Sequence, residues 1–460
     1  MNISRLALAA VAIALSGAAH SEDLLDIYQR ALQSDPTIRE AEANRMASAE
    51  AAPQARGLLF PQINATANET RQDSNGEESF TALKPATRET ITTATPIETP
   101  NIVNTGWQVE LTQTVFRWDQ IAGLQQAGKR VAQADAQYEA AQQNLLLRVS
   151  ERYFDVLAAT DALEASEANR LAIAKQLDQS QKRFEVGLIA ITDVQESQAA
   201  FDQSVADEIA AKRTLATANY LLAEITGSNA NDLAKPGGSI PLVSPEPANE
   251  QAWVEQALAQ NLTLVASRIE SEIASKEVSV RRGGRYPTLD LVVRRGNNET
   301  DLERSNNNSP FTDIFSSSET DSITLQFSVP VFSGFRTSSR IREAVFLHRA
   351  ARERVQRIAR ETERLTRDAY LGVLTEVSRT KALEQAMRSS ETALEATQAG
   401  FEVGTRTTVD VLDAQRNLFN ARTQFLRARY DYLLNVLRLK EASGNLRVQD
   451  LETINKLLIQ

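Results

Sequence analysis

Apolar residues in the second half of the chain recur with the alternating spacing of three and four residues that is typical of a coiled-coil seam. The seam consists of Ile341, His348, Val355, Thr362 and Ala369, interleaved with Ala344, Ala351, Ile358, Leu365 and Gly372. The first half repeats the pattern with Val131, Tyr138 and Leu145, set against Ala134 and Ala141. No proline occurs in residues 101–235 or 331–460, so both stretches can form long helices. The first, from about Trp118 to Val186, would extend on the order of 100 Å, too long for a globular domain.

Four other segments alternate apolar and polar residues with the period of two that predicts a half-buried strand. The alternation is clearest in residues 322–332, where every second residue from Ile323 to Val329 is apolar. The other three strands are centred on Val109, Leu291 and Ala65, of which the last is the weakest. Polar stretches at residues 69–101 and 296–320 separate the two strands of each pair, and we expect them to be long loops in water.

The chain also contains an internal duplication. Residues 184–198 match residues 401–415 at a constant offset of 217, and seven of these fifteen positions are identical. Residues 31–61 likewise correspond to residues 257–287, so each half reads as helix, strand, loop, strand and two long helices. We therefore predict a signal peptide at 1–21, a first structural repeat at 22–235, a linker at 236–250, a second repeat at 251–445 and a C-terminal tail at 446–460.

The first residues and the composition narrow the possible functions. Arg5 precedes an apolar run from Leu6 to Leu15 and then small residues ending at Ser21, the pattern of a secretory signal peptide. A net charge of −10 argues against a nucleic-acid partner. There is no cysteine, and His348 is the only histidine after the signal peptide, so thiol chemistry and most metal sites are excluded. We predict that the chain is not an enzyme and has no catalytic residues, metal or cofactor.

The predicted strands set the oligomeric state. No apolar segment of the mature chain reaches the ~20 residues of a spanning helix, so entry into a membrane would use strands. A membrane does not tolerate open sheet edges, because each unpaired backbone group costs several kcal/mol. Four strands cannot close a conducting barrel, since about eight strands already fill their interior with side chains. Three chains would supply twelve strands and leave a lumen, so we predict a homotrimer embedded in membrane lipid.

These features resemble the TolC family of outer-membrane efflux proteins over essentially the whole mature chain. The matching motifs are residues 23–28 with Asp35-Pro36, the tripeptide Leu59-Phe60-Pro61, and the segments 186–194 and 403–414. The resemblance implies an α+β, mostly α fold: a long coiled-coil helical barrel with four strands per chain contributing to a trimeric 12-stranded transmembrane β-barrel. The tail 446–460 is expected at the middle of this helical tunnel.

The resemblance also implies a function. It identifies the chain as the outer-membrane exit duct of a tripartite efflux pump or type I secretion system, which conducts substrates passively and is gated at its periplasmic tip. The implied location is the outer membrane, with a helical tunnel in the periplasm. The implied partners are a periplasmic membrane-fusion adaptor and an inner-membrane pump of the RND, ABC or MFS type. The cargo is not specified by any residue of the chain.

Two short segments, which we call tip 1 (residues 186–194) and tip 2 (residues 403–414), carry the candidate site. In each, Val-Gly followed by Asp-Val predicts a helix that ends at a glycine and a second helix that starts beside Thr or Asp. Asp410 and Asp413 lie three residues apart, hence on one helix face. Repeated in three chains, they would form an acidic ring that favours cations, and the resemblance places them at the narrowest part of the periplasmic aperture.

The resemblance implies further roles at the tips. Arg406 is expected to act as a latch that pairs with Thr192 and Asp193 of a neighbouring hairpin. Family members can carry a tyrosine where this chain has Phe401, so the latch here would lack that hydroxyl. The expected contacts with the adaptor are Gly187, Leu188, Gly404 and Thr405.

Plainer interpretations remain open at this stage. The tip residues need be nothing more than helix caps, and Arg406 nothing more than a solvated charge near a helix start. The helices alone also fit a soluble periplasmic coiled-coil adaptor protein without a pore, which would need neither the strands nor the long polar segments. A secreted carboxylate enzyme would need a concave site, for which the sequence offers no candidate.

Overall fold

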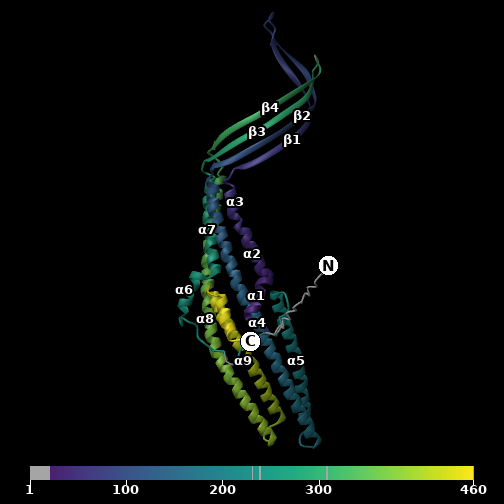
Figure 1. Ribbon diagram of the computed structural model, residues 1–460, viewed down its shortest axis with the longest axis vertical. Helices are drawn as coiled ribbons and strands as arrows, with labels where there is room; N and C mark the ends of the chain where they lie inside the picture. The colour runs from purple at the N-terminus through teal and green to yellow at the C-terminus, as the bar shows by residue number, and fades with distance from the viewer. Residues whose placement is uncertain (1–20, 231, 238–239, 307–308, 459–460) are drawn as a thin grey trace, which may run out of the picture. The chain divides into compact units, whose positions relative to one another are not determined.

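The computed structural model describes residues 21–458 except 231, 238–239 and 307–308, so the predicted signal peptide lies outside the described residues apart from Ser21. The helices are α1 (Leu24–Ser34), α2 (Pro36–Ala49), α3 (Ala51–Gly57), α4 (Trp118–Glu185), α5 (Ile191–Thr226), α6 (Glu250–Gln260), α7 (Leu262–Gly283), α8 (Arg336–Glu402), α9 (Thr408–Ala442) and α10 (Val448–Asn455). The strands are β1 (Gln62–Leu83), β2 (Thr90–Phe116), β3 (Thr288–Asn306) and β4 (Ser309–Ser328). The predicted α+β, mostly α fold with a two-fold repeat is confirmed (Figure 1).

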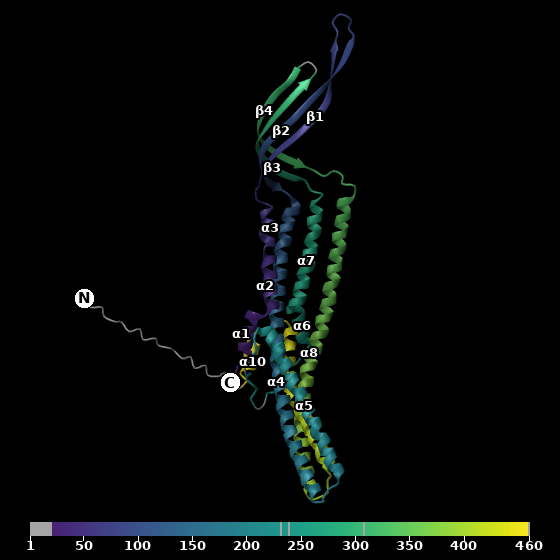
Figure 2. The same cartoon turned by 90° about the vertical axis from the view of Figure 1, so that its right-hand side faces the viewer.

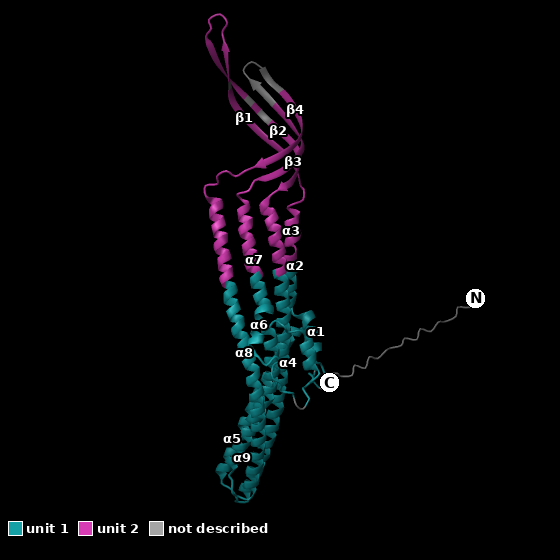
Figure 3. Cartoon of the chain, turned by 90° about the vertical axis from the view of Figure 1, so that its left-hand side faces the viewer, with its two compact units in different colours: residues 1–46, 133–268, 354–460 teal, residues 47–132, 269–353 magenta. Residues whose placement is uncertain are grey.

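The chain divides into two compact units, and each takes segments from both halves of the sequence (Figure 3). Unit 1 comprises residues 1–46, 133–268 and 354–460, and unit 2 comprises residues 47–132 and 269–353. The long helices α4 and α8 contribute residues to both units. The predicted repeat boundaries are divisions along the sequence, and they stay predictions.

Unit 2 contains an antiparallel sheet with the strand order β1-β2-β3-β4. One register row crosses all four strands as Ile63, Leu111, Val293 and Ile323. Its two outermost side chains, Ile63 and Ile323, are 66% and 79% exposed, so the described residues leave both edges of this apolar row largely uncovered.

On the opposite face of the sheet, the neighbouring row is polar. The neighbouring row consists of Asn64, Glu110, Arg294 and Ser322. Within it, Arg294 Nε donates to Glu110 Oε2 at 2.6 Å. In these two neighbouring rows the apolar and the polar residues lie on opposite faces of the sheet in all four strands, which is the pattern of a membrane barrel, in which one face meets lipid and the other meets water.

The predicted polar loops are wrong, because most of their residues continue the strands. β1 and β2 remain paired from Gln62 with Thr112 to Leu83 with Thr90, and a short turn joins them. The pairing of β3 with β4 likewise extends to Asn306 with Ser309. Polar side chains do not prevent this, because an antiparallel ladder satisfies its backbone groups whatever the side chains are.

Two contacts in unit 2 fix the start of α4: a close backbone approach to α7 and a side-chain ion pair to β3. A Cβ on Gly283, at the end of α7, would lie 2.8 Å from the backbone nitrogen of Asp119 in α4, so only glycine fits there. Below the sheet, Arg117 makes two hydrogen bonds, of 3.1 and 2.8 Å, to the buried carboxylate of Asp290. This fork fixes the start of α4 to β3.

The core of unit 1 forms where α1, α4, α5, α9 and α10 meet. Phe154 of α4 stacks on Tyr430 of α9 with ring centroids 5.7 Å apart, and both are buried. Tyr153 is also buried, and its hydroxyl donates to the carbonyl of Ala234 at 2.7 Å. The linker meets the C-terminal tail, because the backbone N–H of Gly237 donates to the carbonyl of Leu457 at 2.9 Å.

Unit 1 also contains two long helical hairpins, formed by α4 with α5 and by α8 with α9. Both hairpins turn at the same end of the unit (Figures 1 and 2). Tip 1 and tip 2 are therefore neighbours, although 217 residues separate them in sequence. Among the described residues, no helix is both long and apolar enough to cross a membrane.

Candidate gate at the two hairpin tips

Tip 1 ends α4 with a left-handed glycine. Gly187 has φ of 78°, and its N–H donates to the carbonyl of Phe184 at 2.8 Å. The N–H of Leu188 then donates to the carbonyl of Arg183 at 2.9 Å. This is the Schellman pattern, which satisfies the last carbonyls of a helix and favours glycine because other residues are strained at positive φ.

Tip 2 ends α8 in the same way. Gly404 has φ of 79°, and its N–H donates to the carbonyl of Phe401 at 3.2 Å. The N–H groups of Thr405 and Arg406 both donate to the carbonyl of Gly400, at 2.8 and 3.2 Å. The two tips thus share one backbone design, as the repeated sequence predicts.

The second helix of each hairpin begins differently. At tip 2, Thr407 is the N-cap, and its hydroxyl accepts from the N–H of Asp410 at 3.2 Å. The Asp410 carboxylate in turn accepts from the Thr407 N–H and hydroxyl, both at 2.9 Å. At tip 1 the N-cap is Ala190, which has no side-chain acceptor, and the Asp193 carboxylate accepts from its N–H at 3.1 Å. Tip 2 therefore has the fuller capping box.

These contacts keep the Asp410 carboxylate ionised. The hydrogen bonds from the backbone and hydroxyl of Thr407, together with the charge of Arg406, hold the pKa of Asp410 below its ordinary value. Asp410 is 40% exposed, so its charge remains accessible to ions in solution. Tip 2 thus presents a permanent negative charge at neutral pH.

Asp413 lies one helical turn further along α9 and is 52% exposed. Arg416 Nη2 is 2.7 Å from Asp413 Oδ1, so this carboxylate has a cation beside it. Arg416 was not predicted, although its spacing of three residues from Asp413 is the spacing of neighbours on a helix face. The two predicted aperture residues are thus brought together on one exposed face, each beside an arginine.

Arg406, the predicted latch, lies against its own hairpin. Its Nη1 is 4.0 Å from Asp410 Oδ1, and its side chain is 59% exposed. A Cβ on Gly400 would come within 2.8 Å of Arg406 Cγ, so Gly400 leaves the space in which this arginine lies. The expected partners Thr192, which is exposed, and Asp193, which is half-buried, belong to the other hairpin. The pairing of these two residues with Arg406 of a neighbouring hairpin stays a prediction.

Phe401 proves to be a buried contact residue. Its side chain is 6% exposed, and the Cζ atom of Arg183 lies 4.3 Å from its ring centroid. The ring is thus covered by a guanidinium from the other hairpin. The prediction for Phe401 concerned only the hydroxyl that it lacks, and the contact with Arg183 was not predicted.

The ends of both tips expose apolar side chains. Val186 and Leu188 at tip 1 and Val403 at tip 2 are 70%, 72% and 76% exposed. Gly187 and Gly404 have open space where a Cβ would project. The four predicted adaptor contacts, Gly187, Leu188, Gly404 and Thr405, all lie at this open end and none is buried.

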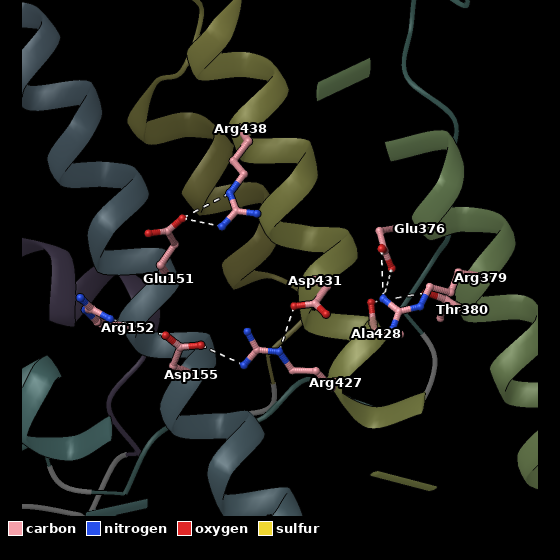
Figure 4. Close-up of polar contacts among 10 residues, drawn as sticks. All are labelled: Glu151, Arg152, Asp155, Glu376, Arg379, Thr380, Arg427, Ala428, Asp431 and Arg438. Atoms are coloured by element: carbon pink, nitrogen blue, oxygen red, sulfur yellow. Dashed lines mark hydrogen bonds and ion pairs between the residues drawn. The ribbon is translucent and has the colours of Figure 1, made fainter. Parts of the chain in front are cut away.

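Ion pairs join the two hairpins away from the tips (Figure 4). Arg427 of α9 lies between Asp155 of α4 and Asp431 of its own helix, at 2.9 and 3.0 Å. Arg438 of α9 pairs with Glu151 of α4 at 2.8 Å. The hairpins of one chain are therefore attached along α4 and α9, while their tips project beyond these contacts. Within the described residues no cluster of acidic or histidine side chains is placed to hold a metal ion.

Comparison with known proteins identifies the family. The sequence pattern described as "Outer membrane efflux protein" matches residues 27–228 and 253–445, one segment in each half. The chain is 36% identical over 445 residues to "Outer membrane protein TolC" of Vibrio cholerae, covering 96% of this chain and 95% of that protein. It is 28% identical over 433 residues to "Alkaline protease secretion protein AprF" of Pseudomonas aeruginosa, covering 94% of this chain and 86% of that protein.

The fold comparison agrees with the sequence comparison. The crystal structure of the outer membrane protein VceC from Vibrio cholerae aligns with a TM-score of 0.70 over 92% of this chain and 96% of that chain, at 18% identity. A shared fold at this low identity extends the likeness from the sequence motifs to the whole architecture. The chain belongs to the outer membrane efflux protein family.

Proposed function

We propose that tip 1 and tip 2 form the gate at the periplasmic end of this outer-membrane exit duct. The observation that carries the proposal is the pair Asp410 and Asp413, held on one exposed face at the start of α9 beside Arg406. The duct itself serves efflux and type I secretion, and its location is the outer membrane. The alternative of a soluble periplasmic adaptor is therefore wrong.

The assembly that such a duct needs is a homotrimer. In the part of the chain that the structure describes, the sheet is closed on neither side, because β1 and β4 each pair with one strand. In lipid, these two edges would leave a row of unpaired backbone groups. Joining β4 of one chain to β1 of the next removes every edge, and three chains give twelve strands with a lumen. The apolar row from Ile63 to Ile323 would then face lipid.

The gate would act by charge and by width. Three copies of Asp410 and Asp413 would place six carboxylates around the axis, and such a ring attracts cations and repels anions. Because the pKa of Asp410 is lowered, its share of this charge persists at neutral and mildly acidic pH. Arg406 of each chain would bind Thr192 and Asp193 of the next and hold the ring narrow until a partner moves the tips.

The partners proposed for these tips are a periplasmic membrane-fusion adaptor and an inner-membrane pump. The exposed Val186, Leu188 and Val403 offer apolar surface for an adaptor, next to Gly187, Gly404 and Thr405. The family name refers to efflux, and one relative is named for alkaline protease secretion. These names support both efflux and protein secretion as uses of the duct. The family is a transport family, and we propose that this member conducts passively, without catalysis or a cofactor.

The test uses the purified wild-type protein in detergent and in planar lipid bilayers. We expect a trimer that forms cation-selective pores of low conductance, which trivalent cations block when they are added on the periplasmic side only. Symmetric block from both sides would place the acidic ring elsewhere in the duct. A monomer without conductance would contradict the proposal entirely.

A further inference from the structure

The two hairpins of one chain touch just before their tips, where α4 and α8 end, through a contact that the proposed gate does not yet use. The Arg183 guanidinium of α4 lies over the Phe401 ring of α8, with Cζ 4.3 Å from the ring centroid. Phe401 is 6% exposed, so this guanidinium acts on a shielded ring. A cation over an aromatic face is attracted by the ring quadrupole, and the attraction strengthens when water is excluded.

The internal repeat supplies a comparison for this contact. Phe184 at tip 1 is the equivalent of Phe401, and it is 41% exposed against 6%. The position equivalent to Arg183 is Gly400, which has no side chain to place over a ring. The same residue type at the same place in the hairpin is therefore buried only where Arg183 covers it.

We infer that Arg183 is a positioning residue of the gate, which clamps Phe401 and so couples tip 2 to tip 1 of the same chain. The inference rests on the proposed function and adds to it a contact within one chain, beside the Arg406 contact between chains. An arginine suits this role better than a lysine, because its planar guanidinium can stack on a ring. The missing hydroxyl at Phe401 leaves an uninterrupted apolar ring for the stack.

Backbone hydrogen bonds connect Phe401 to the turn that bears Arg406. The carbonyl of Phe401 accepts from the N–H of Gly404, and the carbonyl of the preceding Gly400 accepts from the N–H groups of Thr405 and Arg406. A displacement of Phe401 therefore moves the turn that bears Arg406. Force applied to the exposed Val186 and Leu188 of tip 1 would reach Arg406 through Arg183 and this turn, so a partner that grips one tip releases both.

The first experiment is a double-mutant cycle with Arg183→Gln and Phe401→Leu, read as open probability in planar bilayers. Each single variant should open about three-fold more often, the population shift expected from one partly shielded cation–π contact. The double variant should open no more often than either single variant, because both remove the same contact. Arg183→Lys should fall between wild type and Arg183→Gln. Additive effects in the double variant would overturn the inference.

Two further variants distinguish a failure of the proposed clamp from a failure of the proposed gate: Lys182→Gln as a matched control, and Arg406→Ala. Lys182→Gln removes a neighbouring charge that pairs with Asp178 instead, and it should leave gating unchanged. If Arg183→Gln behaves as wild type while Arg406→Ala opens the pore, the gate stands and the clamp is wrong. If neither changes gating, the proposed function of the tips is wrong as well.

A chemical crosslink gives an independent measurement, because the chain contains no cysteine. In the Arg183→Cys, Phe401→Cys variant, a short reducible thiol crosslinker should join the tips within one chain and lower conductance until reductant is added. Monomer mobility on a denaturing gel distinguishes this from a link between chains. The pair Lys182→Cys with Phe401→Cys is the control and should crosslink poorly. Equal crosslinking of both pairs, or a crosslink without effect on conductance, would contradict the clamp.

Discussion

Tip 1 and tip 2 have the same backbone but different chemistry. Both end a helix at a left-handed glycine, Gly187 or Gly404, and both place an aspartate at the third position of the next helix. Residues 184–198 and 401–415 differ at eight equivalent positions, and three of these bear on the gate: Ile189 against Arg406, Ala190 against Thr407, and Glu196 against Asp413. The shared residues are those that a tight helical hairpin requires. The differing residues place the fuller capping box and the predicted latch residue Arg406 at tip 2.

The largest expected effect on the local stability of the tips comes from substituting the glycines that both tips share. Gly187→Val and Gly404→Val each force a β-branched side chain to a positive φ, at a cost of about 1–2 kcal/mol or more. The substituted side chain meets open space at both positions, so the strain is conformational alone. Amide hydrogen exchange at the two tips should accelerate to a similar degree. An effect confined to one tip would show that the two turns are not equivalent.

Substitutions at the helix N-caps should change the rate of amide hydrogen exchange less, and in opposite directions at the two tips. Thr407→Ala removes the hydroxyl that accepts from Asp410, and about 1 kcal/mol of local stability with it. Ala190→Thr supplies the missing acceptor at tip 1 and should slow exchange there by a similar amount. Equal exchange rates in all three proteins would show that the capping difference has no energetic consequence.

Block of the pore by trivalent cations should change least of all with pH over the neutral range. The pKa of Asp410 lies below its ordinary value of 3.8, so its charge and its cap are fully present above that pH. Both are lost only as the pH falls through the lowered value. Block by trivalent cations should therefore be constant from pH 8 to about pH 5 and weaken below about pH 4. Loss of block between pH 7 and pH 5 would mean that another group controls the aperture.

The parts of the fold that follow from local pattern could be predicted from the sequence. The alternation around Ile323 gave β4, the period of the seam gave α8, and Gly187 and Gly404 gave the two turns. The polar ends of the strands could not be predicted in this way, because their pairing is made by backbone groups that every residue carries.

The candidate site was predictable only in part. The placement of Asp410 and Asp413 on one face follows from helical spacing, and Arg416 could have been found by the same rule. The contact of Arg183 with Phe401 could not, because it joins two helix ends that are 218 residues apart and that no local pattern relates. Contacts of that kind depend on how the hairpins pack, which hydrophobic spacing does not specify.

The most direct test of the account compares the acidic residues of the two tips. We expect the variant Asp410→Asn, Asp413→Asn to weaken block by trivalent cations at least about ten-fold in planar bilayers, because it removes six charges from the ring of a trimer. The matched variant Glu196→Gln removes the charge at the position of α5 that is equivalent to Asp413 and should leave block unchanged. Block that survives the double substitution, or that is lost with Glu196→Gln instead, would contradict the assignment of tip 2 as the aperture.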